Sequence, residues 1–290
     1  MHTKQVVTRP LNEQSSTVLE VARGCTHGKC HFCRIAECQP FEMVPFEHIA
    51  EDIAEYDQLV KKPIRIMLYG GDPFVLSNKV LVPILNLIIE TFPGIQSIGG
   101  YARSAGLKHK SDEDLEELAS LRVTDLTSGV ESGYDPAREY MEKGNTAADV
   151  VEQCARLDKA GITYSFFYLP GMCGAGRWEE SGKATAECFN QCNPLRIYTH
   201  TMTPFKDTKL YREIQEGLFQ QSPEHEILKE IRTMLENLDI KTYFLCTHDT
   251  NVIHFDASMP KDKEFACAAI DAHIAKTKEE ALQRFRKCFR

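Results

Sequence analysis

Residues 17–33 read TVLEVARGCTHGKCHFC, a stretch that joins a predicted strand to a group of thiols. Residues 17–22 are mostly apolar or β-branched, which predicts a short buried strand. Cys25, Cys30 and Cys33 follow directly in a loop. Thiols spaced this closely, in a chain whose other cysteines are scattered, indicate a metal or redox site rather than a disulfide framework.

This first strand is one of six that alternate with amphipathic segments along the chain. The other five are predicted at residues 63–69, 95–101, 125–129, 163–169 and 195–202. Helical spacing predicts helices between them at residues 45–60, 80–91, 111–121, 146–160 and 178–192. Two of these helices begin with capping boxes, Ser111 with Asp114 and Thr146 with Asp149. Regular alternation of strands and helices predicts an α/β fold around a parallel sheet.

The end of the chain predicts a different arrangement. Ser222 followed by Pro223 predicts a cap and a first-turn proline, beginning a helix that runs to about residue 238. Residues 239–290 predict a strand at 242–246 and two charged helices, the second begun by a capping box of Thr277 and Glu280. We therefore expect a lead-in at residues 1–16, a main domain at 17–238 and a C-terminal α/β extension at 239–290.

Composition limits the partners. The formal net charge of −8 and the pI near 5.7 predict no nucleic-acid partner, because such binders usually carry a basic surplus on at least one face. No uninterrupted apolar run reaches the roughly 18 residues of a membrane span. The first residues also lack the apolar run of a signal peptide. We expect a cytoplasmic protein with no membrane partner.

Three thiols in one loop suit an iron-sulfur cluster with an open corner. A 4Fe-4S cluster needs four ligands, so a protein that supplies three thiolates leaves one iron for an external ligand. Structural zinc normally takes four protein ligands, and here Cys38, His27 or His31 could complete such a site. From the residues alone, a non-enzymatic zinc- or iron-sulfur-binding redox or regulatory protein stays an alternative.

The loop resembles the signature of the radical S-adenosylmethionine (radical SAM) superfamily, which places three cysteines after the first barrel strand and an aromatic residue before the third. Phe32 stands at that position, while the gap between Cys25 and Cys30 is one residue longer than in the commonest form. The resemblance extends to the oxygen-independent coproporphyrinogen oxidase-like and elongator-like branch. It implies a partial (β/α)6 TIM-type barrel that the C-terminal extension closes, with a 4Fe-4S cluster and S-adenosylmethionine as cofactors.

The same resemblance assigns roles to residues after later strands. Gly70, Gly71 and Asp72 stand where the superfamily has a Gly-Gly-Glu-like motif that meets the amino group of S-adenosylmethionine. Glu131, and after it Ser132, would bind the ribose hydroxyls or the methionine carboxylate of the cofactor. The turn that contains Leu169 and Gly171 would approach the adenine. Arg103 would lie beside the cofactor, where a guanidinium could hold a carboxylate or phosphate.

The implied activity is reductive cleavage of S-adenosylmethionine to a 5′-deoxyadenosyl radical, which abstracts hydrogen from a small-molecule substrate. Cys25, Cys30 and Cys33 are the catalytic metal ligands in this interpretation. Tyr101, His200, Thr201 and His248 are the candidate substrate contacts, since they stand at strand ends or in the tail. A reductase with flavodoxin or ferredoxin would donate the electron.

Two further absences are expected. The scattered cysteines are expected to be buried thiols, without a second cluster: Cys38, Cys154, Cys173, Cys188, Cys192, Cys246, Cys267 and Cys288. Only about 16 residues precede the first strand, too few for a separate domain, so cobalamin-dependent methyl transfer is not expected.

Overall fold

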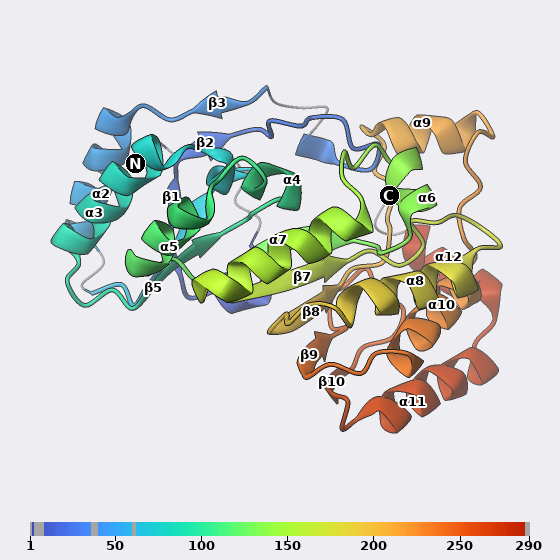
Figure 1. The fold of residues 1–290 in the computed structure, drawn as a ribbon. Coiled ribbons are helices and arrows are strands. Elements are labelled where there is room, and N and C mark those ends of the chain that lie inside the picture. Colours follow the sequence, from blue (N-terminus) through green and yellow to red (C-terminus); the bar gives the residue numbers. More distant parts are fainter. Residues whose placement is uncertain (1, 3–8, 36–39, 60–61, 288–290) are drawn as a thin grey trace.

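The computed structural model (Figure 1) describes residues 2, 9–35, 40–59 and 62–287. Its centre is a curved series of parallel strands that follow one another in chain order. They are β1 (Thr17–Glu20), β4 (Arg65–Tyr69), β5 (Ser97–Gly100), β6 (Leu126–Glu131), β7 (Tyr164–Tyr168), β8 (Arg196–Thr199) and β9 (Thr242–Leu245). Parallel bridges from Ile98 to Val123 and from Tyr101 to Thr127 join the first three strands to the last four.

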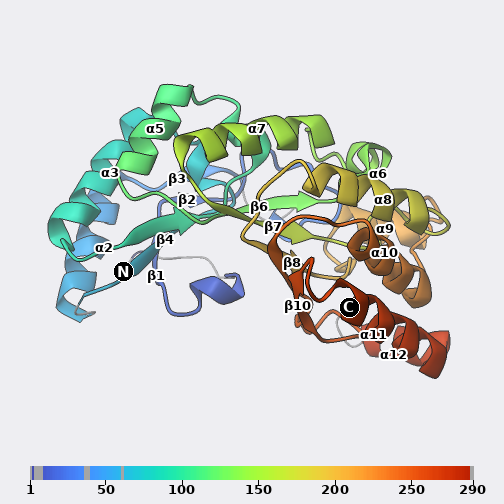
Figure 2. The same ribbon diagram turned by 60° about the horizontal axis from the view of Figure 1, so that its bottom comes forward.

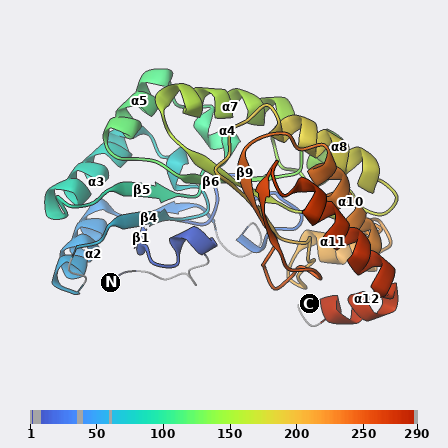
Figure 3. The ribbon, with the colours of Figure 1, turned by 90° about the horizontal axis from the view of Figure 1, so that it is seen from below.

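Helices cover the convex side of these strands (Figure 3). Each of the six predicted strands is followed by at least one predicted helix: α2 (Phe46–Leu59), α3 (Asn78–Thr91), α5 (Asp112–Ser120), α7 (Ala147–Ala160), α8 (Trp178–Phe189) and α10 (Glu224–Glu236). The core lies between the layers, where Leu81, Ile84 and Leu85 of α3 are fully buried with Ile66 and Leu68 of β4. The predicted α/β class is confirmed, and these elements lie within a few residues of the predicted ranges.

The C-terminal extension continues the sheet. β9 pairs parallel to β8, and β10 (Asp256–Met259) adds an antiparallel edge strand that was not predicted. Two helices, α11 (Lys263–Lys276) and α12 (Glu279–Lys287), pack beside this end of the sheet (Figure 2). Because the sheet runs on without interruption, the proposed boundary between residues 238 and 239 stays a prediction.

Capping is predicted correctly for two helices and wrongly for two others. The boxes of Ser111 with Asp114 and Thr146 with Asp149 are both present. Ser222 does not cap α10: its hydroxyl has no hydrogen-bond partner among the described residues, and the N-cap position belongs to Pro223. Instead the Glu279 carboxylate accepts the backbone N–H groups of Glu224 and His225, at 2.7 and 2.9 Å.

The predicted box of Thr277 and Glu280 is also wrong, because Thr277 ends α11 rather than beginning α12. Its hydroxyl donates to the carbonyl of His273 at 2.7 Å, one turn earlier in α11. Glu279 lies between the two residues of the predicted box, and local spacing could not show that its carboxylate instead caps a different helix, α10.

The sequence did not predict several short elements, most of which follow the carboxyl ends of strands. They are η1 (Leu11–Glu13), β2 (Ala22–Arg23), β3 (Glu42–Met43), η2 (Pro73–Val75), α4 (Ser104–Leu107), α6 (Asp135–Tyr140) and α9 (Lys209–Gln215). Elements this short are formed by tertiary contacts and leave no periodic signal. Across the described parts of the chain, every helix is too short or too polar to cross a bilayer.

Candidate functional site

The cysteine loop (residues 24–33) leaves β2 and meets the ends of the next three parallel strands. Its three thiols, Cys25, Cys30 and Cys33, line one cavity of about 240 Å³, here called the cysteine cavity. The rest of its lining comes from several strand ends: Phe32, Ile35, Gly71, Tyr101, Ala102, Arg103, Thr127, Gly129, Glu131, Lys143 and Phe167. The structure therefore brings the three cysteines together with five other residues that the sequence singled out: Phe32, Gly71, Tyr101, Arg103 and Glu131.

A backbone hydrogen bond joins the loop after β4 to the cysteine loop. The N–H of Gly71 donates to the carbonyl of Gly24 at 3.0 Å. A Cβ added to Gly71 would lie 2.4 Å from that same oxygen, so only glycine permits the contact. Gly24 itself has φ +63°, in the left-handed region that favours glycine.

The side chain of His31 fixes the other side of the cysteine loop. Its ring nitrogens lie 3.1 Å from the Glu213 carboxylate and 2.7 Å from Nζ of Lys209. Its backbone N–H and carbonyl bond to Met141 and Leu210. Since both ring nitrogens have protein partners, this arrangement does not offer His31 as a zinc ligand.

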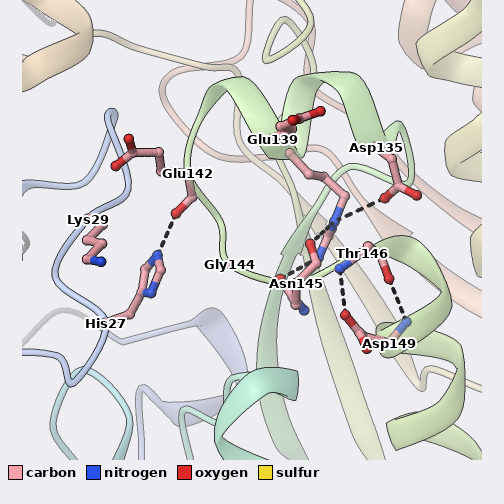
Figure 4. Close-up of a pocket in the computed structure, with 10 residues that line it drawn as sticks. His27, Lys29, Asp135, Glu139, Glu142, Gly144, Asn145, Thr146 and Asp149 are labelled. Carbon is pink, nitrogen blue, oxygen red and sulfur yellow. Dashed lines mark hydrogen bonds and ion pairs between the residues drawn. The ribbon is translucent and has the colours of Figure 1, made fainter.

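The ring of His27 also has a protein partner: Figure 4 shows it directed at the backbone carbonyl of Glu142, to which it is hydrogen-bonded. The Sγ of Cys30 lies 3.8 Å from that same oxygen. The described residues contain no group of three His, Cys, Asp or Glu side chains that could hold one metal ion, and Cys38 lies outside them. A cubane differs from zinc because each thiolate binds a separate iron, so three thiols spread around a cavity fit it.

The outer face of the loop borders a second hollow, of about 590 Å³, between the cysteine loop and the start of α7 (Figure 4). Its polar side chains are largely paired with one another or with backbone: Thr146 with Asp149, and Arg138 with Asn145. Arg138 is 1% exposed and also donates to the carbonyls of Val130 and Ser132, each at 2.6 Å. This side chain therefore supports the end of β6.

Glu131, at the end of β6, is aimed at the cysteine cavity by a backbone irregularity. The pairing of β6 with β7 shifts register between Gly129 and Glu131, and Glu131 has φ +70°, which is rare for a residue with a Cβ. Backbone strain of this kind collects at functional sites.

Among the described residues, only one of the two carboxylate oxygens of Glu131 has a hydrogen-bond partner. Oε1 lies 3.4 Å from Nζ of Lys143, while Oε2 is buried with no hydrogen-bond partner among the described residues. Burial raises the pKa of Glu131, and the charge of Lys143 opposes that rise. A buried carboxylate oxygen without a donor is costly, and a hydrogen-bond donor placed in the cavity would remove that cost.

Lys143 also lines the cysteine cavity, although it was not among the site residues predicted from the sequence. It follows α6 and donates to the carbonyl of Gly129 at 3.0 Å, with Nζ 5.6 Å from the centre of the Phe32 ring. Burial raises the pKa of the Cys30 thiol, and the charges of Lys143 and Arg103 lower it. No local feature of the sequence indicated that this side chain faces the cavity.

Asp72 does not line the cysteine cavity but hydrogen-bonds to Arg103, which does. Oδ1 accepts the backbone N–H of Arg103 at 3.2 Å, and Arg103 in turn donates to the carbonyl of Lys143 at 3.0 Å. Oδ2 is buried without a hydrogen-bond partner among the described residues. Burial raises the pKa of Asp72 to about 7. Gly70 also lies outside the cavity lining, next to Gly71.

The other predicted cofactor contacts, Ser132, Leu169 and Gly171, have protein partners outside the cysteine cavity. The hydroxyl of Ser132 accepts the N–H of Tyr134 at 3.0 Å and sits 3.3 Å from the Thr185 hydroxyl. Leu169 packs in a small apolar cluster, and the N–H of Gly171 donates to Glu230 at 2.7 Å. None of the three lines the cysteine cavity.

A further cavity, the aromatic cavity, adjoins the cysteine cavity and has a volume of about 490 Å³. Both cavities are lined by Tyr101 and Phe167, so these two rings lie at their common border. Of the candidate substrate contacts, Tyr101, His200 and His248 line it. Thr201 does not, because its hydroxyl and backbone N–H both donate to the side-chain oxygen of Asn251, at 3.0 and 2.9 Å.

The other cysteines that the structure describes lie outside the lining of both cavities. Cys154, Cys173, Cys188, Cys192 and Cys246 are buried thiols, as expected, and Cys267 is partly buried. Cys38 and Cys288 lie outside the described residues.

The sequence of this chain is similar to that of a known protein family and of several curated proteins. The family model of the radical SAM superfamily matches residues 19–180, more than half of the chain. The chain is 28% identical over 156 residues to the heme chaperone HemW of Lactococcus lactis, covering 51% of this chain and 40% of HemW. It is 23% identical over 122 residues to the tRNA uridine(34) acetyltransferase of Methanocaldococcus jannaschii, covering 41% and 22%. The chain thus spans less than half the length of these relatives, which belong to the expected branch.

Solved structures agree on the fold. Methylornithine synthase (PylB) superposes with a TM-score of 0.56 at 16% identity, covering 88% of this chain and 68% of that one. The methyltransferase TsrM of Kitasatospora setae, with cobalamin and a [4Fe-4S] cluster bound, gives 0.55 at 15% identity, covering 70% and 39%. These likenesses confirm the predicted partial barrel. The match across residues 19–180 shows that this chain belongs to the radical SAM superfamily, whose members bind a 4Fe-4S cluster and S-adenosylmethionine.

Proposed function

We propose that this protein is a radical enzyme that holds a 4Fe-4S cluster on Cys25, Cys30 and Cys33 and acts on a small-molecule substrate. One observation carries the proposal: the three thiols line the same cavity as Glu131, which has a buried carboxylate oxygen without a hydrogen-bond partner in the described part of the chain. When bound, the cluster and S-adenosylmethionine supply a 5′-deoxyadenosyl radical by reductive cleavage, and that radical abstracts hydrogen from the substrate.

The chain's own residues bind and orient. Three thiolates leave one corner of a cubane open to an external ligand. The free oxygen of Glu131 accepts a hydrogen bond from a hydroxyl or ammonium group of the bound cofactor. Arg103 and Lys143 place two positive charges near the Cys30 thiol, which lower its pKa against the larger rise caused by burial and so favour the ligating thiolate.

The partners follow from this chemistry. Reductive cleavage consumes an electron, so we propose a reductase with flavodoxin or ferredoxin as donor. A reducing compartment such as the cytoplasm would keep the thiols available for the cluster. The named relatives differ in what they do, and the chain covers only part of each, so the substrate must be derived from this chain's own cavities.

Anaerobic purification tests the proposal. We expect a brown protein with about four irons per chain, which forms 5′-deoxyadenosine when S-adenosylmethionine and dithionite are added, as measured by mass spectrometry. Cys30→Ala should abolish the nucleoside. Cys267→Ala, a partly buried thiol outside the cavity, is the matched control and should retain it. A colourless protein with about one zinc per chain would instead support the regulatory alternative.

A further inference from the structure

The aromatic cavity has the size and position of a substrate site. Its volume of about 490 Å³ falls within the roughly 300–1,000 Å³ of small-molecule sites. It lies at the carboxyl ends of β7, β8 and β9, and Leu11 of η1 contributes from the other side. Because it shares Tyr101 and Phe167 with the cysteine cavity, a molecule bound here would lie next to the cofactor.

Aromatic rings form one connected wall of this cavity. The ring of Phe167 lies 6.1 Å from that of Tyr101, 5.6 Å from that of Tyr198 and 4.8 Å from that of His200. His200 in turn stacks on His248 at 3.9 Å, with 17° between the ring planes. A wall of ring faces and edges favours a flat ring that can stack or meet it edge to face.

The wall is uncharged at neutral pH. Burial lowers the pKa of His200 to about 3, and burial also lowers the pKa of His248. The two charged residues of the lining, Arg9 and Asp249, are exposed at the rim, and Arg9 donates to the carbonyls of Glu13 and Ser16. The buried part of a ligand must therefore be uncharged, because nothing there would balance a charge.

The two imidazoles add polar groups of known kind. Nδ1 of His248 lies 2.8 Å from the Thr250 hydroxyl and 3.2 Å from the backbone nitrogen of Thr250, so the Nε2 edge of that ring is the one left for a ligand. Among the described residues, the ring of His200 has no hydrogen-bond partner. A neutral imidazole offers one donor and one acceptor, the pattern that a nitrogen-containing ring matches.

We propose that the aromatic cavity binds the substrate, and that the substrate is a small molecule built on a flat, uncharged, nitrogen-containing aromatic ring. The ring stacks along Phe167 and His200 and hydrogen-bonds to the free imidazole edge of His200. Calling this molecule a substrate rests on the proposed radical function, but its binding to the cavity can be measured without turnover.

Benzimidazole serves as the probe, with cyclohexanecarboxamide as a non-planar comparison. We expect the anaerobic holoenzyme to bind benzimidazole in ligand-observed NMR titrations and to bind the non-planar compound at least about tenfold more weakly. His200→Leu and Phe167→Leu should each weaken benzimidazole binding by roughly tenfold. The matched controls are His109→Leu and Phe265→Leu, at exposed positions outside the cavity, and both should leave it unchanged.

The result can overturn the inference independently of the proposed function. Equal affinity for the two compounds, or equal losses in the cavity and control variants, would refute it. So would binding of a short single-stranded RNA but of no free ring, which would point to a base within a nucleic acid. Should His200→Leu fail to fold, as judged by circular dichroism, His248→Leu at the exposed ring of the stacked pair replaces it with the same expected loss. If benzimidazole binds as expected but no 5′-deoxyadenosine forms, the proposed function fails and the cavity assignment stands.

Discussion

Gly71 and Gly24 meet backbone to backbone, with the N–H of Gly71 3.0 Å from the carbonyl oxygen of Gly24. Through this contact the loop after β4 sets the position of the loop that carries the three cysteines. The resemblance had given this glycine a role toward the cofactor, and the structure shows that it also aligns two strand-end loops. A site assembled from several loops depends on such contacts as much as on its ligands.

Gly71→Ala should therefore displace the cysteine loop. The added Cβ would lie 2.4 Å from the Gly24 oxygen, a distance that both backbones must relieve by moving apart. We expect the variant to lose most of its iron after anaerobic reconstitution, as measured by colorimetric iron analysis. Gly94→Ala is the control, because a Cβ there meets nothing within 4 Å. Full iron content in Gly71→Ala would show that the loop contact does not position the thiols.

Glu131→Gln should weaken cofactor binding more than it disturbs the fold. The amide keeps the shape of the side chain but removes the charge, and a hydrogen bond to a charged group contributes about 1.5–3 kcal/mol. We expect the Kd for S-adenosylmethionine to rise about tenfold or more in equilibrium dialysis. Glu139→Gln, on the exposed side of α6, should leave the Kd unchanged. An unaltered Kd in Glu131→Gln would remove this residue from the cofactor site.

Arg138→Met should destabilise the end of β6. The guanidinium is buried and donates to three backbone carbonyls, those of Val130, Ser132 and Asn145. Leaving such carbonyls buried without donors costs about 1–3 kcal/mol each, so we expect a loss of about 3 kcal/mol or more in the free energy of unfolding by urea. Arg177→Met, at an exposed position, should change it by less than about 0.5 kcal/mol. Similar values for the two variants would contradict this assignment.

Glu230 should make stability depend on pH. Burial raises its pKa from 4.5 to about 7, although Gly171, Ser181 and Cys173 donate hydrogen bonds to the carboxylate. Between about pH 4.5 and 7 the folded state holds a proton that the unfolded state has lost. The free energy of unfolding therefore falls as pH rises through this window, by about 3 kcal/mol from this group, and levels off above it.

The comparison of urea unfolding at pH 5 and pH 8 isolates this effect. In Glu230→Gln the decrease between the two pH values should shrink by about 3 kcal/mol relative to the unsubstituted protein. Glu187→Gln, an exposed position on α8, should retain the full decrease. Identical pH profiles for Glu230→Gln and Glu187→Gln would mean that Glu230 ionises normally in the folded state.

The strands, the main helices and the cysteine loop could be predicted because each leaves a local signal in the sequence: hydrophobic periodicity, a helix cap or the spacing of cysteines. The grouping of Cys25, Cys30 and Cys33 with Arg103 and Glu131 follows from the rule that parallel strands end at one edge. Lys143 was not predicted because its side chain is directed by contacts with the Gly129 carbonyl and the Glu131 carboxylate, which only the tertiary fold brings near it. Thr201 was placed at the site because it follows β8, but its hydroxyl is held by Asn251, a contact fixed only by the tertiary fold.

The most direct test of the central claim is Mössbauer spectroscopy of the ⁵⁷Fe-loaded protein before and after addition of S-adenosylmethionine. A cubane held by three thiolates has one iron open to the cofactor, so we predict that one iron site of about four changes its spectrum while the others do not. A spectrum in which no iron site responds to S-adenosylmethionine would mean that the cluster has no open corner, and would contradict the account.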